Sequence, residues 1–132
     1  MRNYSVVIVA CALLLGSCSG AGRSRNLFEL YMQHERDILA CESVECYREV
    51  TKRYSSNKTL ETLSSMTENA THAMFVNAKE RAAHSLREQE LYVDSEIVKG
   101  AHVTLVLKHR KFAFYRETLP FSREGGTWKI GQ

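Results

Sequence analysis

The hydrophobic pattern of this chain changes its period once, near Leu86. Before that point, apolar residues recur at spacings of three and four, which is typical of one face of a helix. After it, apolar and polar residues alternate, which is typical of half-buried strands. Helices followed by strands, rather than alternating with them, predict the α+β class, with N-terminal helices packed on a curled antiparallel sheet of about four strands.

The helical part is predicted to contain three segments. The first begins near Asn26, which can cap a helix, and the pattern leaves open whether residues 27–54 form one helix or two. A short helix is expected over residues 60–66, and a longer one over residues 71–86.

Four strands are predicted after Leu86, in the segments ELYVDSEIV, AHVTLVLKH, FAFYRETLPFS and TWKI. Gly125-Gly126 is a two-residue hairpin signal between the last two. In the first strand, Leu91, Val93 and Ile97 alternate with residues such as Asp94 and Glu96, and we expect the latter on the solvent face.

The N-terminus has the pattern of a secretory signal. Arg2 precedes an apolar run from Val6 to Leu15, and small residues follow. A helix needs about 20 apolar residues to span a bilayer, so this run predicts an export signal and not a membrane anchor.

The end of this run, LGSC at residues 15–18, resembles the lipobox of bacterial lipoproteins. The resemblance implies transfer of a diacylglycerol to the Cys18 thiol, cleavage before Cys18 and acylation of the new amino group, with palmitate among the chains. The mature protein would then be attached to a membrane without crossing it. Ser19 stands where an aspartate would retain a lipoprotein at the inner membrane, which favours the periplasmic side of the outer membrane.

Two other interpretations of the N-terminus remain. Residues 8–11 also fit the lipobox letters, but cleavage there would leave a very short apolar run and an apolar mature end. An uncleaved, buried N-terminal helix is the second, because the run has no polar face.

We therefore expect a signal peptide at residues 1–17, a lipidated flexible tether at residues 18–25 and a single domain at residues 26–132. Loss of Arg2 with the leader lowers the net charge from +3 to +2. A charge so close to balance gives no indication of nucleic acid as a partner.

The order of helices and strands over roughly residues 27–131, and especially its ending, resembles the nuclear-transport-factor-2-like, or cystatin-like, superfamily. The residues that carry the resemblance are Gly125, Gly126, Trp128, Lys129 and Ile130, together with the hairpin IVKGAHVTLVL. The resemblance implies a fold, and proteins of this fold include enzymes, binding modules and structural subunits.

Isomerases of that superfamily use a carboxylate base in an apolar cavity. The only aspartates of the mature chain are Asp37 and Asp94, and we expect both to be solvated. The five histidines are scattered without metal-ligand spacing, so neither a metal nor a cofactor is expected. His102 beside a predicted strand could face a cavity, although a surface or hydrogen-bonded histidine is the commoner case.

Four residues at a predicted hairpin tip, Lys108, His109, Arg110 and Lys111, form a basic run. Such runs are usually solvated. On a membrane-tethered domain, this run is also a candidate patch for an anionic partner such as acidic lipid or cell-wall polymer.

Two cysteines, Cys41 and Cys46, remain if Cys11 leaves with the leader and Cys18 carries lipid. Two ligands do not close a zinc site, and the spacing is not C-x-x-C. An oxidising compartment favours a disulfide, with free thiols as the alternative.

A disulfide between these residues requires a break in the helix. Five positions along a regular helix separate the α-carbons by about 8 Å, beyond the roughly 7 Å that a disulfide can bridge. The bond therefore predicts a bend between Ala40 and Ser43, with Ser43 as the cap of a new helix.

These observations predict a lipid-anchored, non-catalytic domain that binds a protein partner or a small apolar ligand on the concave side of its sheet. The alternatives are a structural or assembly subunit of an envelope complex and, with less support, an isomerase or dehydratase of the same fold.

Overall fold

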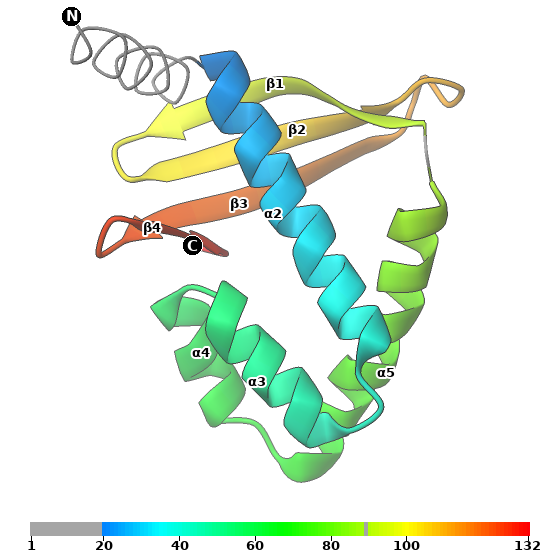
Figure 1. Ribbon diagram of the computed structural model, residues 1–132, viewed down its shortest axis with the longest axis vertical. Helices are drawn as coiled ribbons and strands as arrows, with labels where there is room; N and C mark the ends of the chain where they lie inside the picture. The colour runs from blue at the N-terminus through cyan, green and yellow to red at the C-terminus, as the bar shows by residue number, and fades with distance from the viewer. Residues whose placement is uncertain (1–19, 89) are drawn as a thin grey trace, which may run out of the picture.

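The computed structural model describes residues 20–88 and 90–132 and has the α+β class that the sequence predicts. Four helices, α2 (Gly20–Ala40), α3 (Val44–Tyr54), α4 (Asn57–Ser64) and α5 (Glu68–Arg87), precede four strands, β1 (Leu91–Lys99), β2 (His102–His109), β3 (Arg116–Glu124) and β4 (Thr127–Ile130). The strands form an open antiparallel sheet in the order β1-β2-β3-β4. Figure 1 shows the sheet in the upper half of the molecule and α3, α4 and most of α5 below it.

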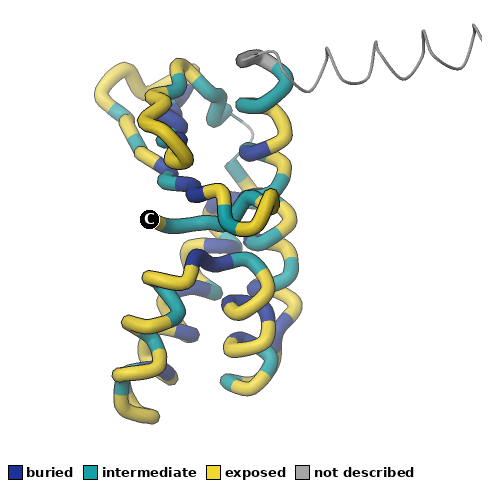
Figure 2. The backbone as a smooth tube through the Cα atoms, turned by 90° about the vertical axis from the view of Figure 1, so that its left-hand side faces the viewer, coloured by how far each residue is buried: buried dark blue, intermediate teal, exposed yellow. Residues whose placement is uncertain are grey.

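Helix α2 joins the two halves because its two ends belong to different apolar clusters. Leu27 and Tyr31 in its N-terminal half pack on buried side chains of the sheet, and Ile38 near its C-terminus packs with α3 and α5. The sequence predicts that all the helices cover the sheet, whereas α2 alone contributes buried residues to the sheet cluster. Figure 2 shows exposed positions along the outer sides of both halves.

Helix α2 begins earlier in the chain than the sequence pattern predicts. We expect a flexible tether through Arg25 and a cap at Asn26, but the helix begins at Gly20. Arg23 and Ser24 contact Glu96 of β1, and these contacts hold the first turns of α2 against the sheet.

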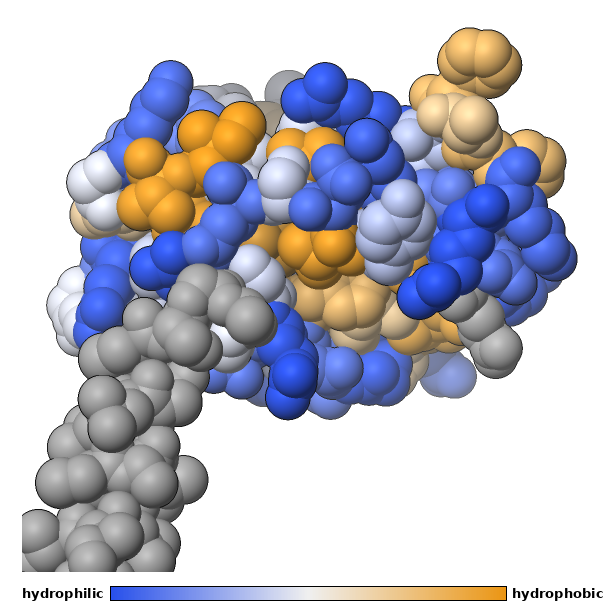
Figure 3. Space-filling view, turned by 90° about the horizontal axis from the view of Figure 1, so that it is seen from above, coloured by the Kyte–Doolittle hydropathy of each residue, from blue (hydrophilic) through white to orange (hydrophobic). Residues whose placement is uncertain are grey.

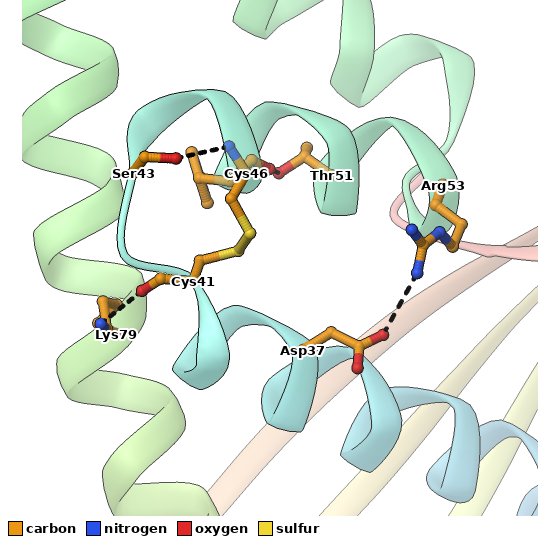
Figure 4. The surroundings of a disulfide bond; sticks show 8 residues. Asp37, Cys41, Ser43, Cys46, Thr51, Arg53 and Lys79 are labelled. Atoms are coloured by element: carbon orange, nitrogen blue, oxygen red, sulfur yellow. Dashed lines mark hydrogen bonds and ion pairs between the residues drawn. A yellow bond between two sulfur atoms is a disulfide. The ribbon is translucent and has the colours of Figure 1, made fainter.

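The disulfide and its geometric condition are both confirmed (Figure 4). Cys41 and Cys46 are bonded with their α-carbons 5.5 Å apart. Helix α2 ends at Ala40, and the Ser43 hydroxyl accepts a hydrogen bond from the Cys46 N–H at the start of α3. Lys79 of α5 donates to the Cys41 carbonyl at 2.5 Å, so residues 27–54 form two helices joined by a fixed corner.

The last strand and the residues after it are hydrogen-bonded to the helical half of the molecule. Gly125 and Gly126 turn the chain into β4 with φ angles of 57° and 80°, which are accessible to glycine without strain. The Ser56 N–H donates to the Ile130 carbonyl at 2.8 Å, and the Ser56 hydroxyl donates to the Gln132 carbonyl at 2.9 Å. The C-terminus is therefore fixed at the start of α4.

Candidate functional site

Strand β1 lies at an edge of the sheet and carries a surface groove. Within the described part of the chain, β1 pairs with β2 alone, so its other side has no strand partner. An open groove of about 580 Å³ runs between this strand and the start of α2. It is lined by residues 91–96 of β1 and by Ser24, Arg25 and Phe28 of α2.

Apolar and charged groups alternate along the upper edge of the molecule, where this groove lies. Figure 3 looks onto that edge and shows apolar side chains gathered between polar ones. Phe28 and Val93 supply apolar walls because both are only partly buried against the sheet core. The edge of the sheet therefore combines free backbone groups with apolar side-chain contacts, the combination that an added peptide strand uses.

A bulge in β1 determines which side chains reach the groove. Val93 pairs with Leu107 but Ser95 pairs with Val106, so Asp94 is an extra residue in the ladder. The extra residue reverses the alternation, and the prediction that Glu96 faces solvent is wrong because its carboxylate turns toward α2. Ile97, predicted on the apolar face, is instead 45% exposed.

Glu96 is held by an ion pair and a hydroxyl. Arg23 Nε lies 3.3 Å from Glu96 Oε2, a second guanidinium nitrogen binds Oε1, and the Ser24 hydroxyl donates to Oε2 at 2.7 Å. The hydrogen bond with Arg23 lowers the pKa of Glu96 below its usual range, and Ser24 adds to this effect. The carboxylate therefore stays charged and fixes α2 beside the groove.

The predicted basic patch spans the end of β2 and the turn after it, but its four residues have different environments. Lys108 lies 3.3 Å from Asp94, and Lys111 lies 3.6 Å from Glu90. The Arg110 guanidinium stands over the ring of Tyr92 at 5.4 Å. These three side chains are accessible to an anionic partner, although two of them already face a carboxylate.

His109, the fourth member of the predicted patch, is buried and not part of the surface. Its Nδ1 accepts the backbone N–H groups of Lys111 and Phe112 at 3.0 and 3.2 Å, and Nε2 lies 2.9 Å from Glu88 Oε1. Because Nδ1 accepts, a neutral imidazole carries its proton on Nε2, toward the carboxylate. This contact lowers the pKa of Glu88. His109 thus organises the turn that follows β2.

That turn contains the most exposed apolar side chains of the described residues. We expect a strand from Phe112, but β3 begins at Arg116 and residues 110–115 form the turn. Phe112 is 63% exposed and Phe114 is fully exposed. The sequence does not single out either residue, because both fall within the segment FAFYRETLPFS that is predicted as a strand.

The two candidate catalytic aspartates do not lie in apolar cavities. Asp37 on α2 accepts hydrogen bonds from Tyr54 and Gln33 and lies 3.7 Å from Arg53 of α3. Asp94 is partly exposed beside Lys108. Both carboxylates are thus paired with cations at partly exposed positions, and neither lies in the apolar surroundings that the isomerase interpretation requires.

Three other polar side chains, Tyr31, Tyr115 and His102, are paired with neighbouring hydroxyl or carboxylate groups. Burial raises the pKa of Tyr31 to about 12, and its hydroxyl lies 3.3 Å from that of Ser85. Burial also raises the pKa of Tyr115, together with its hydrogen bond to Glu117. His102 Nδ1 lies 3.1 Å from the Ser122 hydroxyl, so this histidine is hydrogen-bonded at the sheet surface.

The described residues contain no cluster of three His, Cys, Asp or Glu side chains with metal-binding geometry. None of the described helices combines the length and apolar character needed to cross a bilayer. Cys18, the predicted lipidation site, lies outside the described residues.

Comparisons of the chain with models of protein families, with curated proteins and with solved structures find no match.

Proposed function

We propose that this chain is a non-catalytic, lipid-anchored domain of the bacterial cell envelope that binds an extended segment of a partner protein along β1. The observation that carries the proposal is the free edge of β1 beside a groove of about 580 Å³. An extended segment would pair with the strand backbone and place alternate side chains against Phe28 and Val93.

We propose the edge of the sheet as the binding site, in place of the concave face that the sequence suggests. Helix α2 covers the core of that face through Leu27 and Tyr31. What remains open beside α2 is the strip along residues 91–96. A bulge such as that at Asp94 bends an edge strand and discourages uniform pairing, which favours a specific partner over unspecific addition of strands.

The anchor is proposed from the resemblance of residues 15–18 to a lipobox, with Cys18 as the acylated residue, on the periplasmic side and at the outer membrane rather than the inner one. The superfamily assignment, nuclear-transport-factor-2-like or cystatin-like, rests on the glycine turn before β4 and is part of the same proposal. Labelling of cells with radioactive palmitate tests the anchor. Cys18→Ala should abolish the label and Cys11→Ala should not, whereas a labelled Cys18→Ala chain would contradict it.

Site-specific photo-cross-linking in intact cells tests the partner site. Ser95 is exposed and lines the groove, and Glu80 on α5 is an exposed control outside it. A benzophenone amino acid at position 95 should give one discrete protein adduct that position 80 does not give. The same adducts from both positions, or none from position 95, would refute binding along β1.

A second candidate is the capture of a small apolar ligand between α3 and α4. A hollow of about 280 Å³ lies there, with Tyr47, Leu60 and Leu63 among its lining residues. Mass spectrometry of the purified protein under native conditions would show a bound small molecule, and substitution of Leu63 by Gln should remove it.

No specific observation favours a structural subunit over this binding role. The isomerase or dehydratase alternative gains no support from Asp37 or Asp94, which are partly exposed and paired with cations.

A further inference from the structure

The turn between β2 and β3 presents two phenylalanines to solvent. Phe112 is 63% exposed and Phe114 is fully exposed, the two highest exposures among the large apolar residues of the described chain. Single exposed apolar residues are common, but two such rings within three positions of one turn form a projecting apolar tip. Figure 3 shows apolar side chains projecting at the end of the molecule where β2 and β3 are joined.

The turn is held in one conformation by hydrogen bonds. His109 Nδ1 accepts from the N–H groups of Lys111 and Phe112, and the Tyr115 N–H donates to the Phe112 carbonyl at 3.0 Å. The His109 and Phe112 rings are 4.5 Å apart. The ring of Phe114 is thus exposed on a fixed turn, and little conformational entropy would be lost when a partner covers it.

Cations flank the two rings. Arg110 and Arg116 are exposed, and neither has an acidic side chain within ion-pair distance among the described residues. Lys111 is 70% exposed at its side chain, with Glu90 3.6 Å away. At the surface of an anionic bilayer, aromatic rings can contact the acyl chains while neighbouring cations contact the phosphates. The turn presents both kinds of group side by side.

The turn lies on the same side of the molecule as the start of α2. Figure 1 shows the Gly20 end of α2, strand β1 and the β2–β3 turn along one upper edge. Leu39, near the other end of α2, lies 19 residues away from Gly20, which is about 30 Å along the helix.

We propose that the β2–β3 turn is a membrane-contact site that inserts Phe114, and part of Phe112, into the surface of an anionic phospholipid bilayer. Arg110 and Arg116 contact the phosphates at the same time. This inference goes beyond the groove along β1 and does not depend on acylation of Cys18, because the exposed rings and cations that carry it all lie within residues 109–116.

The test places a tryptophan at each end of the molecule in the full chain, with Trp128→Phe as the background. Phe114→Trp reports on the turn, and Leu39→Trp, at a residue 37% exposed, is the matched control. Both chains are reconstituted in vesicles of phosphatidylcholine and phosphatidylglycerol with brominated acyl chains. The leader segment is common to both, so a difference between the two probes reports their position relative to the bilayer.

Trp at position 114 should shift its emission to shorter wavelength and lose most of it to bromine quenching, while Trp at position 39 should do neither. Each cation near an anionic membrane surface should raise the ratio of inserted to free turn about fivefold. Arg110→Gln together with Arg116→Gln should therefore lower this ratio by about 25-fold. Equal quenching at positions 114 and 39 overturns the proposal and leaves a protein partner as the occupant of the turn. Equal quenching of position 114 in vesicles without phosphatidylglycerol overturns the assignment to anionic lipid.

Discussion

Removal of the disulfide should lower the free energy of unfolding by about 2 kcal/mol. The bond closes a loop with a sequence separation of 5 residues. For a loop of this size, the loss of chain entropy in the unfolded state corresponds to about 2 kcal/mol at 25 °C. Because Cys41 is fully buried, alanine is a better replacement than serine, which would bury a hydroxyl without a partner.

Urea unfolding of the oxidised protein, the reduced protein and the Cys41→Ala/Cys46→Ala variant measures this contribution. Reduction and substitution should lower stability by similar amounts, because Ser43 still caps α3 and Lys79 still binds the Cys41 carbonyl in the reduced protein. A melting temperature lower by about 10 °C should accompany the change. Unchanged stability on reduction would refute the entropic account, and a much larger loss in the variant alone would show that packing of the sulfur atoms dominates.

Three further changes test other parts of the fold. Gly131→Ala should cost about 1–3 kcal/mol in urea unfolding, because Gly131 has a φ of +109° and an added β-carbon would lie 2.4 Å from the Thr59 hydroxyl oxygen. Phe121→Ala, at a fully buried position in the sheet core, should cost about 3–5 kcal/mol and give a largely unfolded protein by circular dichroism. The pKa of Glu96 is lower in the folded protein than in the unfolded chain. Its pair with Arg23 therefore stabilises the fold at pH values above the pKa of an unfolded glutamate, and this stabilisation is lost as the pH falls through the pKa of the folded state. Arg23→Met should therefore cost about 1 kcal/mol at neutral pH and progressively less below about pH 4.

The sequence predicts the class of fold because hydrophobic period and chain order are local properties. The helices, the strands and the Gly125-Gly126 hairpin lie close to their expected positions. The corner at Ser43 is also predictable, since a disulfide cannot bridge five residues of a regular helix. The spatial relation of α3–α5 to the sheet is a tertiary property, and the pattern of apolar residues does not specify it.

The candidate site is less predictable because it depends on two departures from regular pairing. The bulge at Asp94 reverses the faces of Glu96 and Ile97, and no residue type in ELYVDSEIV indicates it. The turn after His109 contains KFAFY, whose aromatic residues are typical of a strand. Two backbone N–H groups bound to His109 Nδ1 stabilise the turn instead, and that contact arises only when the chain folds back on the imidazole.

The early start of α2 links the proposed anchor to the proposed groove. Cys18 lies two residues before the first residue of α2, so a lipid on Cys18 would be at most about 7 Å of chain from Gly20, at the end of α2 that lies beside β1. The groove along β1 would then face the membrane surface, and its partner segment would have to lie close to the bilayer. A flexible insert of about 20 Gly and Ser residues after Ser19 has a span of about 25 Å and would release this restraint. The insert should reduce the cross-link from position 95 in cells without changing the far-ultraviolet circular dichroism of the protein, and an undiminished cross-link would show that the partner reaches the groove away from the membrane.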